Sequence, residues 1–89
     1  MPPHRRVKAR TPEHAALGEA IRRTRKRAEL SQEELADIAE INAKQIGILE
    51  RGTGNPSYTT LARVASALEV RIGDLTTLAD RLHDRRRLG

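Results

Sequence analysis

The stretch SQEELADIAEINAKQIGILERG, residues 31–52, decides the fold, because its apolar residues recur at the spacing of two short amphipathic helices. Ser31 is followed three residues later by Glu34, which is the pattern of a capping box. This pattern starts the first helix, which we predict over about residues 32–39.

A second helix follows after very few residues. Asn42 is the expected N-cap, the helix covers about residues 43–50, and Gly52 ends it. Such a pair forms either a helix-turn-helix or two consecutive helices of any small bundle.

Three more helices are expected outside this stretch. Apolar residues at helical spacing predict a first helix over about 13–28, a fourth that starts after Ser57 and reaches about 69, and a fifth from about 72 to about 86. No strand-like alternation appears in the sequence. The chain is therefore expected to be all-α, with five helices joined by tight turns.

Composition limits the class of protein. The 89 residues suit one domain, and 37% of them are apolar, with Tyr58 as the only aromatic residue. The chain has no cysteine, which excludes disulfides and a cysteine-ligated zinc site. No apolar run approaches the roughly 20 residues that span a bilayer, and the basic N-terminus lacks the apolar core of a secretory signal. We therefore expect a cytoplasmic protein that does not enter a membrane.

The net charge of +5 lies in the flanks of the chain. Between residues 31 and 75 there are four basic and seven acidic residues, so the middle is acidic. A basic total favours a polyanion as partner. The alternative is solvated surface charge with a disordered basic tail.

The spacing of apolar residues within the helix pair favours a helix-turn-helix over two consecutive helices of a bundle. Counted from Gln32, apolar residues fall at positions 4, 8, 10, 15 and 18, and position 5 is Ala36, where crossing helices leave room for a methyl group only. Together with LGEAIRRTRKRAELSQEELA, INAKQIGILERGTGNPS and LARVASALEV, this pattern resembles the Cro and phage-repressor type of helix-turn-helix, the XRE family. The resemblance covers about residues 14–76. It implies a compact five-helix lambda-repressor-like DNA-binding domain with the helix-turn-helix in its second and third helices.

The resemblance also implies which side chains contact DNA. The third helix would lie in the major groove, with base-reading positions at Ala43, Lys44, Gln45, Gly47 and Ile48. Gln32 resembles the phosphate-anchoring glutamine of the family. The remaining phosphate contacts would come from Arg51, Asn55, Ser57, Tyr58 and Thr59. Exposed polar residues are also ordinary on helices that bind nothing, and Arg51 could instead interact with the C-terminus of its own helix.

Two further positions carry structural expectations. The family resemblance implies that Arg25 and Glu50 form a partly buried ion pair between the first and third helices. The turn between the second and third helices usually carries glycine, because the backbone is left-handed there, but this sequence has Glu40. We expect Glu40 to cost stability.

Outside the domain, the chain ends are basic. We expect a flexible arm over residues 1–12, a helix-turn-helix domain over 13–79, and an extension of the fifth helix with a basic tail over 80–89. The arm could add salt-sensitive affinity for DNA. Its basic residues considered for DNA contact are Arg5, Arg6, Lys8 and Arg10.

The fifth helix carries an apolar stripe that extends beyond the length needed to close a small core. We interpret it as a homodimer interface, with the alternative that the extra turns fold back on the first helix. The stripe consists of Ile72, Leu75, Leu78, Ala79 and Leu82. A homodimer would place two reading helices about 34 Å apart on a palindromic operator.

No catalytic, metal-binding or phosphate-cradling pattern occurs in the sequence, so an enzyme is not expected, and neither a cofactor nor a small-molecule effector domain is expected. The function hypothesis is a sequence-specific regulator of transcription that binds double-stranded DNA as a repressor or autoregulator. The alternative is a protein-interaction module, such as an antitoxin or controller component, whose fifth helix binds a toxin or another regulator.

Overall fold

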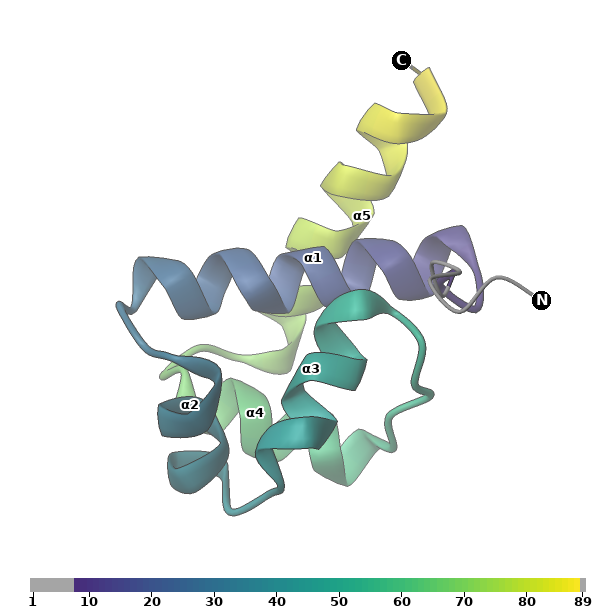
Figure 1. Cartoon of the computed structure of the whole chain (residues 1–89). Coiled ribbons are helices and arrows are strands. Elements are labelled where there is room, and N and C mark those ends of the chain that lie inside the picture. The colour runs from purple at the N-terminus through teal and green to yellow at the C-terminus, as the bar shows by residue number, and fades with distance from the viewer. Residues whose placement is uncertain (1–7, 89) are drawn as a thin grey trace, which may run out of the picture.

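The computed structural model describes residues 8–88, and this range contains five α-helices joined by short turns (Figure 1). The helices are α1 (Pro12–Arg27), α2 (Gln32–Ala39), α3 (Ala43–Arg51), α4 (Tyr58–Ala67) and α5 (Ile72–Leu88). The predicted all-α five-helix fold is confirmed. None of these helices combines the length and the apolar character that a membrane-crossing segment needs.

Local side chains set the helix starts. The predicted capping box is present: the Ser31 amide donates to Glu34 Oε1 at 2.8 Å, and the Glu34 amide donates to Ser31 Oγ at 3.0 Å. Each of the helices α1, α3 and α4 also begins with a side chain that accepts a hydrogen bond from a first-turn amide. These N-caps are Thr11, Asn42 and Ser57. Each cap satisfies a helix amide that has no partner within the helix, so the starts follow from the sequence alone.

The helix ends follow a different rule, because three of them use glutamate in the left-handed conformation. Glu29, Glu40 and Glu69 have φ of 60°, 59° and 59°, and Gly52 ends α3 with φ of 74°. After each glutamate comes an apolar residue whose amide bonds back to the last turn of the helix, in the pairs Leu30 to Arg25, Ile41 to Ala36 and Val70 to Ala65. This closure ends α4 at Ala67, two residues before the predicted end.

The core of the described residues is built from aliphatic side chains. The largest fully buried side chains come from all five helices: Ile21, Leu35, Ile46, Val64 and Leu75. α1 lies across the molecule, with α2, α3 and α4 on one side of it, while α5 crosses α1 and extends beyond it (Figure 1). The long α1 therefore holds the helix-turn-helix and α5 together.

The apolar stripe of α5 faces α1. Leu75, Ala79 and Leu82 are buried within the chain, and Ala79 and Leu82 form a second core cluster with Ala16 and Ala20 of α1. The other two stripe residues, Ile72 and Leu78, are half-buried. Most of the stripe is thus covered inside one chain, because the small alanines of α1 let α5 pack closely. A dimer interface at this stripe stays a prediction. The alternative, that the fifth helix folds back on the first, describes the structure.

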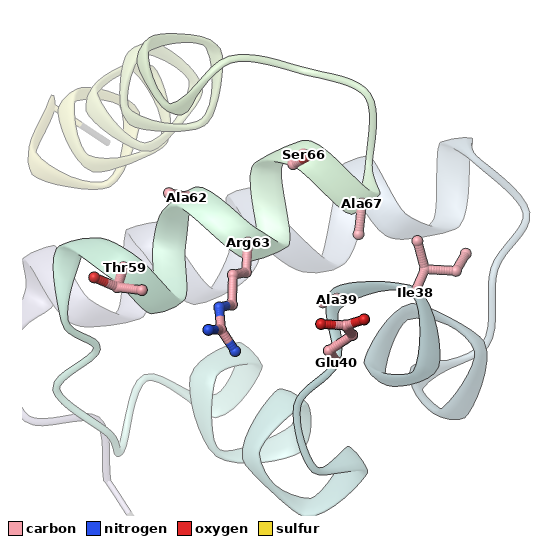
Figure 2. Close-up of a pocket in the computed structure, with 8 residues that line it drawn as sticks. All are labelled: Ile38, Ala39, Glu40, Thr59, Ala62, Arg63, Ser66 and Ala67. Atoms are coloured by element: carbon pink, nitrogen blue, oxygen red, sulfur yellow. The ribbon is translucent and has the colours of Figure 1, made fainter.

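A shallow groove of about 370 Å³ separates α2 from α4 (Figure 2). The Glu40 carboxylate and the Arg63 guanidinium both point into this space. The backbone of Glu40 is left-handed, as the turn requires. Its side chain is exposed and lines the same groove as Arg63. Between α1 and α3 the two helices are in tight contact at Gly18.

Candidate nucleic-acid interface

The first turn of α3 presents two polar side chains to solvent. The Lys44 amide donates to Asn42 Oδ1 at 2.7 Å, which fixes the start of the helix. Lys44 and Gln45 follow directly and are both exposed. An ammonium group can donate to guanine O6 or N7, and a carboxamide can pair with adenine N6 and N7. The turn therefore offers two groups of the kind that read base edges.

The other three positions expected on this face are placed differently. Gly47 is buried, Ala43 is half-buried and packs against the main core, and Ile48 is half-buried. Ile48 lies against Gly54, where an added Cβ would be 2.7 Å from its Cγ2. Of the five positions, only Lys44 and Gln45 are fully exposed, because α3 packs against both α1 and α2. The base-reading role of the other three stays a prediction.

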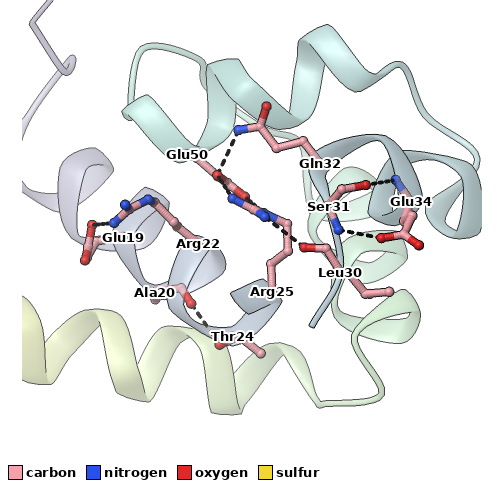
Figure 3. Close-up of polar contacts among 10 residues, drawn as sticks. All are labelled: Glu19, Ala20, Arg22, Thr24, Arg25, Leu30, Ser31, Gln32, Glu34 and Glu50. Atoms are coloured by element: carbon pink, nitrogen blue, oxygen red, sulfur yellow. Dashed lines mark hydrogen bonds and ion pairs between the residues drawn. The ribbon is translucent and has the colours of Figure 1, made fainter. Parts of the chain in front are cut away.

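At its C-terminal end, α3 is tied to α1 by a buried ion pair (Figure 3). Arg25 and Glu50, the pair implied by the family resemblance, lie in contact: Arg25 Nε donates to Glu50 Oε2 at 2.6 Å and Arg25 Nη2 donates to Glu50 Oε1 at 2.9 Å. Their side chains are 10% and 4% exposed. The remaining Arg25 nitrogen, Nη1, donates to the Leu30 carbonyl at 2.8 Å. The carboxylate raises the pKa of the Arg25 guanidinium above its ordinary value, and burial opposes this rise.

Gln32 belongs to the same network. Its Nε2 donates to Glu50 Oε1 at 3.0 Å, and the side chain is half-buried (Figure 3). The predicted phosphate anchor therefore has an internal partner for its amide group, which joins the start of α2 to α1 and α3. Sequence spacing placed Gln32 at the helix start, but only the folded chain brings it to Glu50.

The loop after α3 carries Asn55, a predicted phosphate contact, and it is held by His14, which was not predicted to contact this loop. His14 Nε2 lies 3.1 Å from Asn55 Oδ1, and His14 Nδ1 lies 2.7 Å from Thr11 Oγ1. With Nε2 protonated, the imidazole donates to the Asn55 carbonyl oxygen and leaves the amide group of Asn55 directed away from His14. No local pattern signals this contact, because 41 residues separate the two side chains.

The root of the N-terminal arm lies on the same loop. The Arg10 amide donates to the Gly52 carbonyl at 2.9 Å, and Arg10 Nε donates to the Thr53 carbonyl at 3.2 Å. Lys8 is exposed, whereas Arg5 and Arg6 lie outside the described residues. The arm therefore leaves the domain beside the loop that follows α3.

The remaining predicted phosphate contacts differ in what surrounds them. Arg51 and Tyr58 are exposed, and Tyr58 keeps 75% of its surface accessible. Thr59 is exposed at the edge of the groove between α2 and α4. Ser57 Oγ accepts from the Thr60 amide at 3.1 Å and so caps α4. Arg51 and Tyr58 thus present functional groups outward, while the Ser57 hydroxyl serves the helix.

Known proteins share both the sequence pattern and the fold. Over 56 residues the chain is 36% identical to the immunity repressor protein of Bacillus phage phi105; the match covers 63% of this chain and 39% of that protein. The chain thus spans about two fifths of the length of this curated relative.

Solved structures with this fold include two regulators. The restriction-modification controller protein C.AhdI from Aeromonas hydrophila superposes with a TM-score of 0.72 at 29% identity, over 73% of this chain and 98% of that chain. The clp gene regulator ClgR from Corynebacterium glutamicum gives a TM-score of 0.83 at 28% identity, over 85% of this chain and 81% of that chain.

The family assignment rests on a match to most of the domain. The helix-turn-helix family model matches residues 21–75, which run from the core of α1 through α2, α3 and α4 to the first turn of α5. The expected resemblance to phage repressors is confirmed by this match and by the phage relative. The chain therefore belongs to the helix-turn-helix family.

Proposed function

We propose that this chain is a regulator of transcription that binds double-stranded DNA sequence-specifically, as a repressor or autoregulator. Its family is a class of DNA-binding regulators rather than a class of enzymes. The observation that carries the proposal is the pair of exposed polar side chains, Lys44 and Gln45, on the first turn of a helix whose other end is anchored in the core.

In this mechanism α3 enters the major groove with its N-terminal turn first. Lys44 donates to a guanine and Gln45 pairs with an adenine, so the two side chains select sequence. The positive charges of Arg51, Arg10 and Lys8 face phosphates and add affinity that falls as salt rises. The arm over residues 1–12 and the tail over 80–89 contribute in the same sequence-independent way.

We further propose a homodimer on a palindromic site. One reading helix covers only a few base pairs, and a second copy doubles the contacts at half-sites about 34 Å apart. Within the apolar stripe of α5, Leu75, Ala79 and Leu82 are buried in the chain, so only its half-buried residues, Ile72 and Leu78, offer surface to a second copy. This role needs no metal or cofactor and places the protein in the cytoplasm, on the nucleoid.

Selection of bound duplexes from a random pool tests sequence-specific binding. We expect one enriched, two-fold symmetric sequence, and footprinting of the DNA beside the protein's own gene should protect a copy of it. Lys44→Ala and Gln45→Ala should change which bases are enriched. Equal binding to all duplexes, or enrichment that both substitutions leave unchanged, would contradict the assignment of α3 as the reading helix.

A second candidate is a controller or antitoxin component that acts through a protein partner, such as a toxin or another regulator. It is favoured by the likeness to C.AhdI, a controller protein that the match covers over 98% of its length. Salt dependence separates the two candidates. A DNA-binding regulator loses affinity for random duplex steeply as salt rises, whereas a protein-interaction module shows little duplex binding at any salt concentration.

A further inference from the structure

Two glycines that contact or end α3 are explained by the fold. A Cβ at Gly18 of α1 would lie 2.4 Å from the Leu49 carbonyl oxygen and 2.6 Å from the Glu50 carbonyl oxygen, so only glycine lets α1 approach α3 this closely. Gly52 ends α3 with φ of 74°, and a Cβ there would lie 2.9 Å from Ala15 Cα. At both positions the added atom would meet backbone, which cannot move aside easily.

Gly47 has no such explanation. It lies in the interior of α3, where glycine weakens a helix relative to alanine. The three atoms nearest to an added Cβ all belong to the side chains of Arg51 and Gln32: Arg51 Nη1 at 3.1 Å, Gln32 Oε1 at 3.8 Å and Arg51 Cζ at 3.9 Å. What glycine leaves open at this position is therefore space that the guanidinium of Arg51 occupies.

The direction of the Arg51 side chain is informative. Arg51 is one turn after Gly47, and its guanidinium lies back over Gly47, toward the N-terminus of α3. It therefore lies away from the carbonyl groups at the C-terminus of its own helix, the alternative partner that sequence alone left open. Among residues 8–88, no ion pair includes Arg51.

The surroundings of this guanidinium point to an anion from outside the chain. Lys44 and Arg51 are seven residues apart, so they share one face of α3 with Gly47 between them. Gln32 is held by Glu50 through Nε2, which leaves its Oε1 beside Gly47. The positive charge of Arg51 is thereby kept on the exposed stripe of α3 that carries Lys44, next to the start of α2.

We propose that Gly47 is a positioning residue for DNA binding: its missing side chain seats the Arg51 guanidinium across α3, where it meets a backbone phosphate. This inference rests on the proposed function, because it assumes that α3 lies on DNA. It adds that the affinity carried by Arg51 depends on residue 47, although residue 47 itself contacts no base.

Substitutions of increasing size at position 47 test whether Gly47 positions the Arg51 guanidinium. Gly47→Ala shifts the guanidinium by a few tenths of an ångström and should lower affinity for the selected site about twofold, whereas Gly47→Leu fills the space and should lower it about tenfold, the size expected for one lost charge-assisted contact. Both variants should melt no lower than the wild type, because alanine and leucine favour helices more than glycine does. The matched control is Gly73→Ala, since an added Cβ there meets nothing within 4 Å and should leave affinity unchanged.

A double-mutant cycle with Arg51→Ala makes the inference falsifiable. Arg51→Ala and Gly47→Leu should each reduce the slope of log affinity against log salt by about one, and Gly47→Leu should cause no further loss once Arg51 is gone. If Gly47→Leu still lowers affinity in the Arg51→Ala background, or leaves the salt slope unchanged, the proposed role of Gly47 is wrong. The leucine side chain would then clash with DNA directly.

Binding of the wild-type chain distinguishes a failure of the proposed function from a failure of the proposed role of Gly47. A wild-type chain that binds no duplex would overturn the proposed function itself. A wild-type chain that binds its selected site while Arg51→Ala binds it equally well would overturn only the role of Gly47 and Arg51.

Discussion

At its N-terminal turn, α3 extends Lys44 and Gln45 into solvent, whereas at its C-terminal end the backbone is pressed against Gly18 of α1 and the Glu50 side chain is buried in an ion pair. The same short helix thus presents Lys44 and Gln45 to solvent at one end and makes its close backbone contact and its ion pair with α1 at the other. A reading surface gains accuracy when rigid elements hold it in place. Substitutions of Gly18 and Glu50 should therefore change stability, and substitutions of the exposed Lys44, Gln45 and Arg51 should change DNA affinity.

The largest effect is expected from Glu50→Ala. It leaves the Arg25 guanidinium buried without its carboxylate and removes the acceptor of Gln32, so the free energy of unfolding should fall by about 3 kcal/mol. Thermal unfolding followed by circular dichroism should show a Tm lower by more than about 10 °C. The control is Arg25→Met with Glu50→Met, which leaves no unpaired charge and should recover much of the loss. An unchanged Tm in Glu50→Ala would show that the Arg25–Glu50 ion pair does not stabilise the fold.

Gly18→Ala should have the next largest effect. The added Cβ would overlap two backbone carbonyl oxygens of α3, so α1 and α3 must move apart, at a cost of about 2 kcal/mol. Denaturant unfolding measures the change. Gly73→Ala serves again as the control, because the same methyl group enters open space there. If Gly18→Ala were as stable as the wild type, the close packing of α1 on the end of α3 would not be an anchor.

Lys44→Ala tests the other end of the helix. Because the side chain is exposed, Tm should stay within about 2 °C of the wild type, as expected for a surface substitution. Affinity for the selected site should fall by about 1 kcal/mol relative to random duplex, since one base contact is lost. Titration of labelled duplexes gives both affinities. Equal losses for both duplexes would show that Lys44 contacts phosphate rather than a base.

The smallest effect is expected at the turn between α2 and α3. Glu40→Gly relieves a left-handed glutamate but gives the unfolded chain more freedom, so we expect a net gain of about 0.5 kcal/mol with the same selected site. Glu29→Gly and Glu69→Gly are matched controls, because both residues have the same backbone conformation at other helix ends. Destabilisation by Glu40→Gly alone would mean that the Glu40 carboxylate near Arg63 outweighs the backbone strain.

Prediction from sequence was most accurate where a pattern is local. The capping box at Ser31 and the cap at Asn42 involve neighbouring residues, and both were predicted. The left-handed Glu29 and Glu69 were not predicted, because glutamate carries no turn signal and the helix ends depend on Leu30 and Val70 entering the core. For the candidate site, the position of Lys44 followed from the family resemblance, but the burial of Gly47 depends on side chains from α2 and the end of α3.

The sequence by itself determined the helix starts, the apolar spacing of the helix-turn-helix and thereby the family, because these features depend on residues within a few positions of one another. Only the tertiary structure decided what each face packs against. It placed Ala79 and Leu82 of the α5 stripe on Ala16 and Ala20, Gln32 on Glu50, and Arg51 over Gly47. These contacts join side chains from distant segments of the chain. They form only when packing of the core fixes the distances between the helices.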